Sequence, residues 1–263
     1  MACTLVEVDR GVVVAVNDTG ARTGFPVVVH HGMMASIRDA ALFDSLAAAG
    51  RRVISLARPG YGESSPVVLH DVAEWGALAD AVLDEMQVDA CDILGISSGA
   101  PYAYALAARC PARTRRVYIF SGIPALYDAR VAALWPYPLD PDATLADLRV
   151  LARTLFFAGL TPEQASEPAA RDAAAHDCFG VALDLMIRRR AWGFDLRDIG
   201  ARVLMQHAVD DSTVPFAAAV MTASLLPQCS FEARSTGEHF SAELLDAFLR
   251  RTVLGAAAQA EPA

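Results

Sequence analysis

The sequence predicts an α/β protein built on an eight-stranded, mostly parallel sheet with helices on both faces. Short runs rich in β-branched residues alternate with longer periodic stretches rich in alanine and leucine, which is typical of parallel strands joined by helical crossovers. Most of the short runs are apolar throughout, as strands buried on both faces should be. The length of 263 residues suits one large domain or one domain that carries an insertion.

The strands follow in order along the chain. Residues 4–8 and 12–16 are separated by Asp9-Arg10-Gly11, which predicts an antiparallel hairpin at one edge of the sheet. Six later runs predict the remaining strands. They cover residues 26–30, 52–56, 92–95, 116–120, 202–206 and 230–234.

Helical spacing of apolar residues predicts five helices that cover the sheet. Gly50 and Pro111 are stop signals after the first and the third of them. The predicted helices cover residues 36–49, 71–86, 98–108, 216–226 and 241–251.

Residues 124–197 break this rhythm and predict an inserted helical cap. They contain no strand-like run, and several prolines lie among helical patches rich in aromatic residues. We therefore expect an α/β core formed by residues 1–123 and 198–254, with the cap inserted between its two parts. Residues 255–263 are of low complexity and predict a flexible tail.

Composition narrows the range of functions. All 22 basic residues are arginine, which excludes chemistry that needs a lysine, such as a Schiff base. The net charge of −9 disfavours a nucleic-acid partner, because neutralising phosphates needs a basic face. No early segment fits a signal peptide or a membrane span, so we expect a cytoplasmic protein without a membrane partner. Five scattered cysteines without a C-x-x-C pair predict no disulfide framework and no metal site.

A candidate nucleophile lies in residues 95–99, Gly-Ile-Ser-Ser-Gly, between a predicted strand and a predicted helix. In this context G-x-S-x-G is typical of a nucleophile elbow. Its serine is held in a strained backbone conformation, and its glycines let strand and helix approach closely. A plain strand–helix turn is the alternative interpretation. Ser97 is the candidate nucleophile.

A serine hydroxyl needs a general base and an acid that orients this base. The sequence offers both downstream. Either Asp210 or Asp211 can supply the acid, from the loop 207–215 after one predicted strand. His239 can supply the base, from residues 236–240 after the last predicted strand. Because the carboxyl ends of parallel strands meet at one edge of a sheet, we expect these groups to come together.

The chain resembles the α/β-hydrolase fold superfamily over nearly its whole length. Residues 27–33, VVVHHGM, resemble the family's strand that ends in His-Gly. Residues 57–64, ARPGYGES, resemble its D-x-P-G-x-G-x-S turn, with Ala57 in place of the usual aspartate. Residues 207–215, HAVDDSTVP, resemble its H-G-x-x-D-x-x-V-P loop, with Ala208 in the glycine position.

The resemblance implies a serine hydrolase that acts by acyl transfer. Ser97 attacks a carbonyl carbon, His239 takes the serine proton and returns it to the leaving group, and water then releases the acid. The family's loop spacing selects Asp211 as the acid that orients the imidazole. The backbone N–H groups of Met33 and Ser98 are expected to form the oxyanion hole. No metal or organic cofactor is required.

Substrate specificity is expected to lie in the cap. We call the loop that follows residues 26–30 and carries Met33 the oxyanion loop. His31 is expected to line the site or to organise that loop. The cap aromatics Trp135, Phe157 and Trp192 can line an apolar substrate pocket, although aromatics at helical spacing mostly pack a small core. Arg188-Arg189-Arg190 can bind an anionic substrate, but a solvated helix face is the favoured interpretation.

The leading functional prediction is a serine hydrolase with a small-molecule acyl substrate, such as a carboxylic ester. The alternative is a ligand-binding protein, a receptor or scaffold on the same fold with little turnover. The resemblance also covers thioesterases, amidases, peptidases, lactonases, carbon–carbon bond hydrolases and perhydrolases. The serine nucleophile argues against the dehalogenase and epoxide-hydrolase branches, which place an aspartate there.

Overall fold

The computed structural model describes residues 3–8, 11–138, 140 and 142–255. Asp9 and Arg10 of the predicted hairpin turn, and residues 256–263 of the predicted tail, lie outside this part of the chain. The strands are β1 Thr4–Val8, β2 Val12–Gly20, β3 Pro26–His30, β4 Arg52–Leu56, β5 Cys91–Ile96, β6 Thr114–Phe120, β7 Arg202–Ala208 and β8 Cys229–Arg234.

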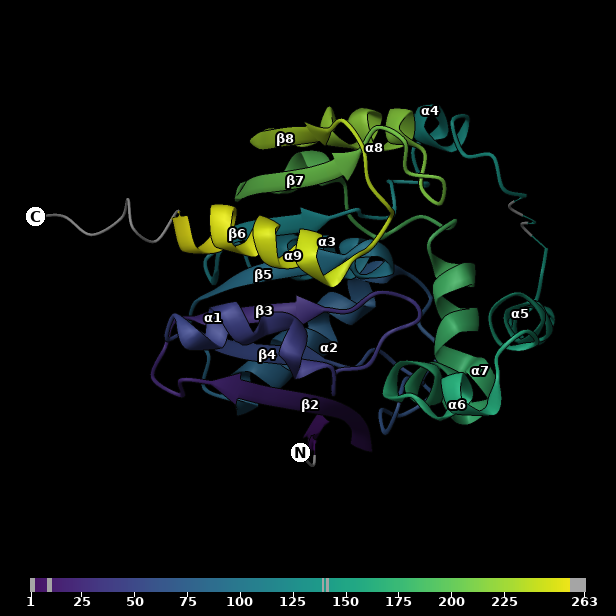
Figure 1. Cartoon of the computed structure of the whole chain (residues 1–263), viewed down its shortest axis with the longest axis horizontal. Helices are drawn as coiled ribbons and strands as arrows, with labels where there is room; N and C mark the ends of the chain where they lie inside the picture. Colours follow the sequence, from purple (N-terminus) through teal and green to yellow (C-terminus); the bar gives the residue numbers. More distant parts are fainter. Residues whose placement is uncertain (1–2, 9–10, 139, 141, 256–263) are drawn as a thin grey trace, which may run out of the picture.

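These strands form one eight-stranded sheet in the order β1-β2-β4-β3-β5-β6-β7-β8 (Figure 1). β2 pairs antiparallel with both β1 and β4. From β4 to β8 every neighbouring pair is parallel. The predicted α/β fold, with its antiparallel hairpin at one edge, is confirmed.

Helices cover both faces of the sheet, as predicted. They are α1 Asp44–Ala48, α2 Val72–Glu85, α3 Ala100–Arg109, α8 Phe216–Ala223 and α9 Ala242–Leu249. α2, α3 and α8 pack in the core of one face, and α1 and α9 pack in the core of the other. The first helix, α1, is shorter than the predicted 36–49. Residues 36–39 form a loop instead, because they make hydrogen bonds to residues far away in the sequence. The Asn17 amide donates to the Ile37 carbonyl at 2.6 Å, and the Ser36 hydroxyl donates to Asp172.

The central strands are apolar throughout because their side chains alternate between two buried cores. Val28 of β3 belongs to the core under α2 and α3, whereas Val27 and Val29 belong to the core under α9. Ile93 and Leu94 of β5 divide in the same way. The sheet is therefore covered on both faces. Ligands can reach it at the carboxyl ends of the parallel strands.

The chain between β6 and β7 adds a helical layer beyond that end of the sheet (Figure 1). We call residues 124–197 the cap segment. Where the structure describes it, this segment contains no strand, and its helical elements follow in sequence order. They are α4 Ala129–Ala132, α5 Leu145–Ala152, a π-helical turn Arg153–Phe157, α6 Pro162–Ser166, α7 Pro168–Ile187 and a short 3-10 turn Leu196–Asp198. The division into core and cap domains at these boundaries stays a prediction.

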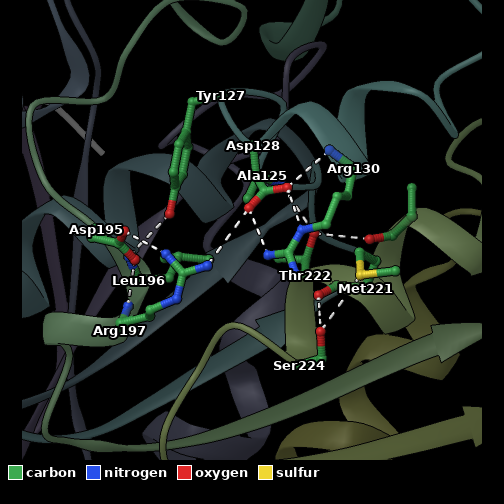
Figure 2. A network of polar contacts seen from close by, with 11 residues as sticks. Ala125, Tyr127, Asp128, Arg130, Asp195, Leu196, Arg197, Met221, Thr222 and Ser224 are labelled. Carbon is green, nitrogen blue, oxygen red and sulfur yellow. Dashed lines mark hydrogen bonds and ion pairs between the residues drawn. The ribbon is translucent and has the colours of Figure 1, made fainter.

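The two ends of the cap segment are tied to each other (Figure 2). The Leu196 N–H donates to the Tyr127 hydroxyl at 3.0 Å. The Arg197 guanidinium lies 3.7 Å from the Asp128 carboxylate. The chain therefore leaves and re-enters the core at nearly one point. No helix within the described residues is long and apolar enough to cross a membrane.

The helix α7 is interrupted near its middle by residues in the left-handed region. His176, Asp177 and Cys178 have positive φ values of 50, 58 and 59°, a conformation that costs free energy in residues other than glycine. The side chain of Arg149 donates to the Asp177 carbonyl at 2.9 Å, and Arg153 pairs with the Asp177 carboxylate at 2.5 Å. These contacts from α5 and the π-helical turn hold the bend and set the direction of the second half of α7.

The turn from β5 to α3 is packed against its neighbours without spare volume. A Cβ atom on Gly99 would lie 2.0 Å from the carbonyl oxygen of His30, at the end of β3. A Cβ atom on Gly95 would lie 2.9 Å from the Cα of Ala100 and 2.9 Å from the Cβ of Ala103. Only glycine lets the helix approach both strands this closely.

We expect Gly99→Ala to lower the free energy of unfolding by about 1–3 kcal/mol or more. The added methyl group overlaps a backbone oxygen that cannot move without displacing β3. Urea denaturation measures the change. Gly200→Ala is the matched control, since Gly200 is exposed and has no neighbouring atom within 4 Å of an added Cβ. Equal stability of the two variants would contradict this account of the turn.

Candidate active site

Ser97 occupies the turn between β5 and α3, where the chain changes direction. Its φ of 51° lies in the left-handed region, which strains any residue with a side chain. The tight fit of Gly95 and Gly99 enforces this conformation, and the Ile123 N–H fixes it further by donating to the Ser97 carbonyl at 3.0 Å. This is the backbone geometry that the G-x-S-x-G pattern predicts for a nucleophile elbow.

The structure joins the three residues that the sequence selected in one chain of hydrogen bonds. His239 Nε2 lies 2.8 Å from Ser97 Oγ, and His239 Nδ1 lies 2.8 Å from Asp211 Oδ2. Because a carboxylate only accepts, the hydrogen bond at Nδ1 places the imidazole proton there. Nε2 is then free to accept the serine proton. Serine, histidine and aspartate stand in the arrangement that activates a hydroxyl for attack on a carbonyl.

Asp211 is held in place and kept ionised by four donors. Its Oδ1 accepts the backbone N–H groups of Thr213 and Val214 at 2.8 and 2.9 Å. Its Oδ2 faces His239 and lies 3.2 Å from His207 Nε2. Burial alone would raise the pKa of this carboxyl, but the hydrogen bonds from His207, His239 and the Val214 N–H outweigh it and hold the pKa below its usual range. The site therefore has a permanent anion beside the imidazole.

The neighbouring aspartate points to a different partner. Asp210 Oδ1 accepts the backbone N–H of Gly237 at 2.8 Å, and Gly237 lies in the loop that carries His239. The two adjacent acids thus have different partners. Asp211 contacts the imidazole of His239, whereas Asp210 binds the backbone of the loop that carries His239. His207, near the end of β7, shares its Nε2–H between Asp211 Oδ2 and the Val214 carbonyl, which lies 2.9 Å away.

The two predicted oxyanion donors both lie beside Ser97. Ser98 follows it directly at the start of the helical turn that leads into α3. Met33 follows Gly32, whose Cα is close enough to the elbow that an added Cβ would lie 3.7 Å from Ser97 Cβ. Both residues border the same cavity as Ser97. Their role as donors to an oxyanion stays a prediction.

His31 is committed to the loop that carries these groups. Its Nδ1 donates to the Gly32 carbonyl at 2.7 Å, and its Nε2 accepts the Arg58 N–H at 3.4 Å. Burial, with the neighbouring Arg58 charge, lowers its pKa well below the usual value. The ring borders the cavity, but both of its nitrogens serve the backbone.

A cavity of about 750 Å³ opens in front of Ser97 and His239. Core loops and the cap segment both contribute to its mainly apolar wall. Among its lining residues are Met33, Met34, Ile37, Leu42, Phe43, Ile96, Ile123, Leu151, Leu155, Leu185 and Phe240. Its size and polarity suit a small, largely apolar molecule.

The cap aromatics predicted to line this cavity fall into two groups. Trp135 borders it, whereas Phe157 and Trp192 are not among the described residues that do. Trp192 is 1% exposed and its ring packs on Tyr104, so it belongs to the core beneath the cap. Phe156 borders the cavity in place of Phe157. The two phenylalanines are neighbours in the π-helical turn and point in different directions, and of the pair only Phe156 borders the cavity.

Arg188 lies in the cavity wall, although the sequence analysis favoured a solvated helix face for residues 188–190. Arg188 is partly buried and borders the cavity, whereas Arg190 is exposed as a solvated face predicts. The Arg188 guanidinium lies 5.5 Å from the ring centre of Trp135, and its buried Nε has no hydrogen-bond partner among the described residues. Burial lowers its pKa from the usual value. Within the described ranges, no group of three or more His, Cys, Asp or Glu side chains is placed to hold a metal ion.

The ionised Asp211 predicts a pH-dependent stability. Its pKa is lower in the folded chain than in the unfolded one, so its contribution is fully present above the unfolded value of about 4 and is lost as the pH falls toward the folded value. The difference in unfolding free energy between the wild type and Asp211→Asn should therefore be constant down to about pH 5 and should shrink as the pH falls further, to about pH 3. Urea denaturation across this range measures it, with Asp210→Asn as the control. A difference that is constant with pH would contradict the assignment.

Comparisons with known proteins agree with this fold. A family model described as the alpha/beta hydrolase family matches residues 27–249. An uncharacterized hydrolase from Bacillus subtilis is 25% identical over 125 residues, which are 48% of this chain, and the chain spans only 41% of that relative. A 2-hydroxy-6-oxo-2,4-heptadienoate hydrolase from Pseudomonas putida is 28% identical over 218 residues, or 78% of each protein.

A solved structure shows the same likeness in three dimensions. An esterase from Exiguobacterium antarcticum superimposes with a TM-score of 0.75 over 97% of this chain and 99% of the esterase. Its sequence identity of 19% makes this a likeness of fold. Because the family model matches most of the sequence, and the sheet and its covering helices agree with it, the chain belongs to the alpha/beta hydrolase family.

Proposed function

We propose that this hydrolase is a serine hydrolase that cleaves a small carboxylic ester or a related acyl substrate through an acyl-enzyme intermediate. One observation carries the proposal. Ser97, His239 and Asp211 form a continuous chain of 2.8 Å hydrogen bonds that opens into a largely apolar cavity. A serine in an ordinary strand–helix turn would need neither the imidazole nor the ionised carboxylate behind it.

In the proposed reaction, Ser97 Oγ attacks the carbonyl carbon while its proton passes to His239 Nε2. Asp211 stabilises the imidazolium that forms and keeps the ring in the required tautomer. The N–H groups of Met33 and Ser98 stabilise the negative charge that develops on the carbonyl oxygen, a contribution of about 100- to 1,000-fold per donor in comparable sites. His239 then protonates the leaving group, and water repeats the sequence to release the acid.

We expect Ser97→Ala to retain the fold and to lose at least about 99% of the turnover of a chromogenic acyl ester, because it removes only the attacking oxygen. Ser98→Ala is the matched control. It keeps the backbone N–H and should retain most of the activity. Stoichiometric labelling by a fluorophosphonate, detected by mass spectrometry, should occur in the wild type and in Ser98→Ala.

The competing function is ligand binding without turnover on the same fold. A wild-type protein that binds an apolar ester, fails to hydrolyse it and resists fluorophosphonate labelling would overturn the proposal in favour of that function. Activity that survives Ser97→Ala would move the nucleophile elsewhere.

A second candidate is hydrolysis of a carbon–carbon bond in a ketone that carries a carboxylate. Two observations favour it. The Pseudomonas putida relative is named for 2-hydroxy-6-oxo-2,4-heptadienoate, a keto acid, and Arg188 places a cation in the wall of the mainly apolar cavity. The first step is again addition of Ser97 to a carbonyl carbon, but the departing group is a carbon that conjugation must stabilise until it is protonated. Arg188 would hold the substrate carboxylate.

Arg188→Gln tests this second candidate. We expect it to raise KM for acyl or keto substrates that carry a carboxylate by about 10- to 100-fold, as befits the loss of one charged hydrogen bond, and to leave KM for neutral esters nearly unchanged. Arg190→Gln removes an exposed arginine from the same helix end and is the matched control. Equal effects on charged and neutral substrates would remove Arg188 from recognition. Steady-state kinetics on paired substrates gives the answer.

A further inference from the structure

A buried arginine that the mechanism above does not use lies beneath the oxyanion loop. Arg58 follows β4 and is 0% exposed. Its Nη1 donates to the His31 carbonyl, and its Nη2 donates to the Gly32 carbonyl at 3.2 Å. The guanidinium therefore contacts the two backbone carbonyls that precede Met33, one of the two proposed oxyanion donors.

The same guanidinium is held from the other side by the cap segment. Asp184 of α7 accepts Arg58 Nη2 at 2.6 Å and Nε at 3.2 Å, a contact between residues 126 positions apart. The hydroxyls of Tyr61 and Tyr102 donate to the same carboxylate at 2.9 and 2.6 Å. The two tyrosine rings also lie with their centres 4.8 Å from the guanidinium carbon. Arg58 thus has a single orientation, and α7 supplies the anion that fixes it.

The orientation of the Gly32 carbonyl decides where the Met33 N–H points. The two groups belong to one planar trans peptide, so they point in opposite directions. Gly32 has no side chain to restrain the rotation of this peptide. Its oxygen is instead held by two donors, His31 Nδ1 at 2.7 Å and Arg58 Nη2. If the carbonyl were released, the peptide would be free to turn and the N–H would leave the position beside Ser97.

We infer that Arg58 is a positioning residue for the oxyanion donor Met33, and that Asp184 makes this donor depend on the seating of α7. The inference rests on the proposed serine mechanism. Asp184 also lies one helical turn before Arg188, which borders the cavity. The helix that contacts the substrate cavity is therefore the helix that orients the oxyanion loop.

The packing of α7 on this loop supports the coupling. An added Cβ on Gly180 of α7 would lie 2.4 Å from the Tyr61 ring, and one on Gly60 would lie 2.4 Å from the Phe179 ring. Helix and loop meet without space between them. A displacement of the second half of α7 would therefore move Asp184 away from Arg58, because no slack exists to absorb it.

The energetics of the pair favour a role in orientation over one in stability. Desolvating two charges costs about as much as their attraction returns, so a buried ion pair adds little net stability compared with apolar packing. The pair does provide directional hydrogen bonds from a rigid, planar group. A second buried carboxylate offers the comparison. Asp92 lies 2.5 Å from Arg51 and accepts Arg115 Nε at 2.8 Å, at the opposite ends of the strands and far along β5 from Ser97.

The test compares Asp184→Asn with Asp92→Asn, which makes the same change at a buried ion pair outside the site. We expect Asp184→Asn to lower kcat for a neutral acyl ester by about 10- to 100-fold, a part of the effect of losing an oxyanion donor, with KM within about threefold. A trifluoromethyl ketone, which adds Ser97 Oγ to its carbonyl carbon and leaves an oxyanion, should lose affinity by a similar factor. Asp92→Asn should lower the thermal midpoint but keep kcat and ketone affinity within about threefold.

Tyr102→Phe keeps the test decisive if Asp184→Asn does not fold. It removes one hydrogen bond to Asp184 and leaves the ion pair intact, and we expect it to lower kcat and ketone affinity together by about three- to tenfold. Unchanged kcat and ketone affinity in the folded variants would overturn the inference and leave the proposed function standing. A wild-type protein that neither hydrolyses the ester nor binds the ketone would overturn the proposed function, and this inference with it.

Discussion

The close approach of α3 to the ends of β3 and β5 is the constraint on which the rest of the site depends. Gly99 lies against the His30 carbonyl and Gly95 against Ala100, which leaves the residue between them no ordinary backbone conformation. Ser97 consequently takes a positive φ and projects from the top of the sheet. The same contact brings the loop after β3 beside the serine, so one packing contact places both the proposed nucleophile and the loop that carries the proposed oxyanion donor Met33.

The sequence predicted the sheet well because its strands are buried on both faces and leave a continuous apolar signal. It was less accurate where tertiary hydrogen bonds compete with helix formation. Residues 36–39 have helical periodicity, but Ser36 binds Asp172 of the cap segment and Ile37 binds Asn17 of β2. The local pattern of apolar residues does not indicate such distant partners, so it cannot predict where they override helix formation.

The sequence also predicted the candidate site only in part. Ser97, Asp211 and His239 each lie in a short motif after a strand, and parallel topology brings such positions together. The cavity wall was harder to predict, because the choice between Phe156 and Phe157 depends on helix rotation and not on residue type. The contact of Arg58 with Asp184 joins loop and cap across 126 positions, and neither residue has a local pattern that indicates the other.

The tied ends of the cap segment have a consequence for how such an enzyme can evolve. Tyr127 forms a hydrogen bond with Leu196, and Asp128 lies close to Arg197. The insertion is therefore attached to the core as one closed loop. The entropy of closing a loop rises only with the logarithm of its length, so a doubling costs about 0.6 kcal/mol. Natural selection can lengthen, shorten or replace the inserted helices, and with them part of the cavity wall, while the hydrogen-bonded residues on the sheet remain in place.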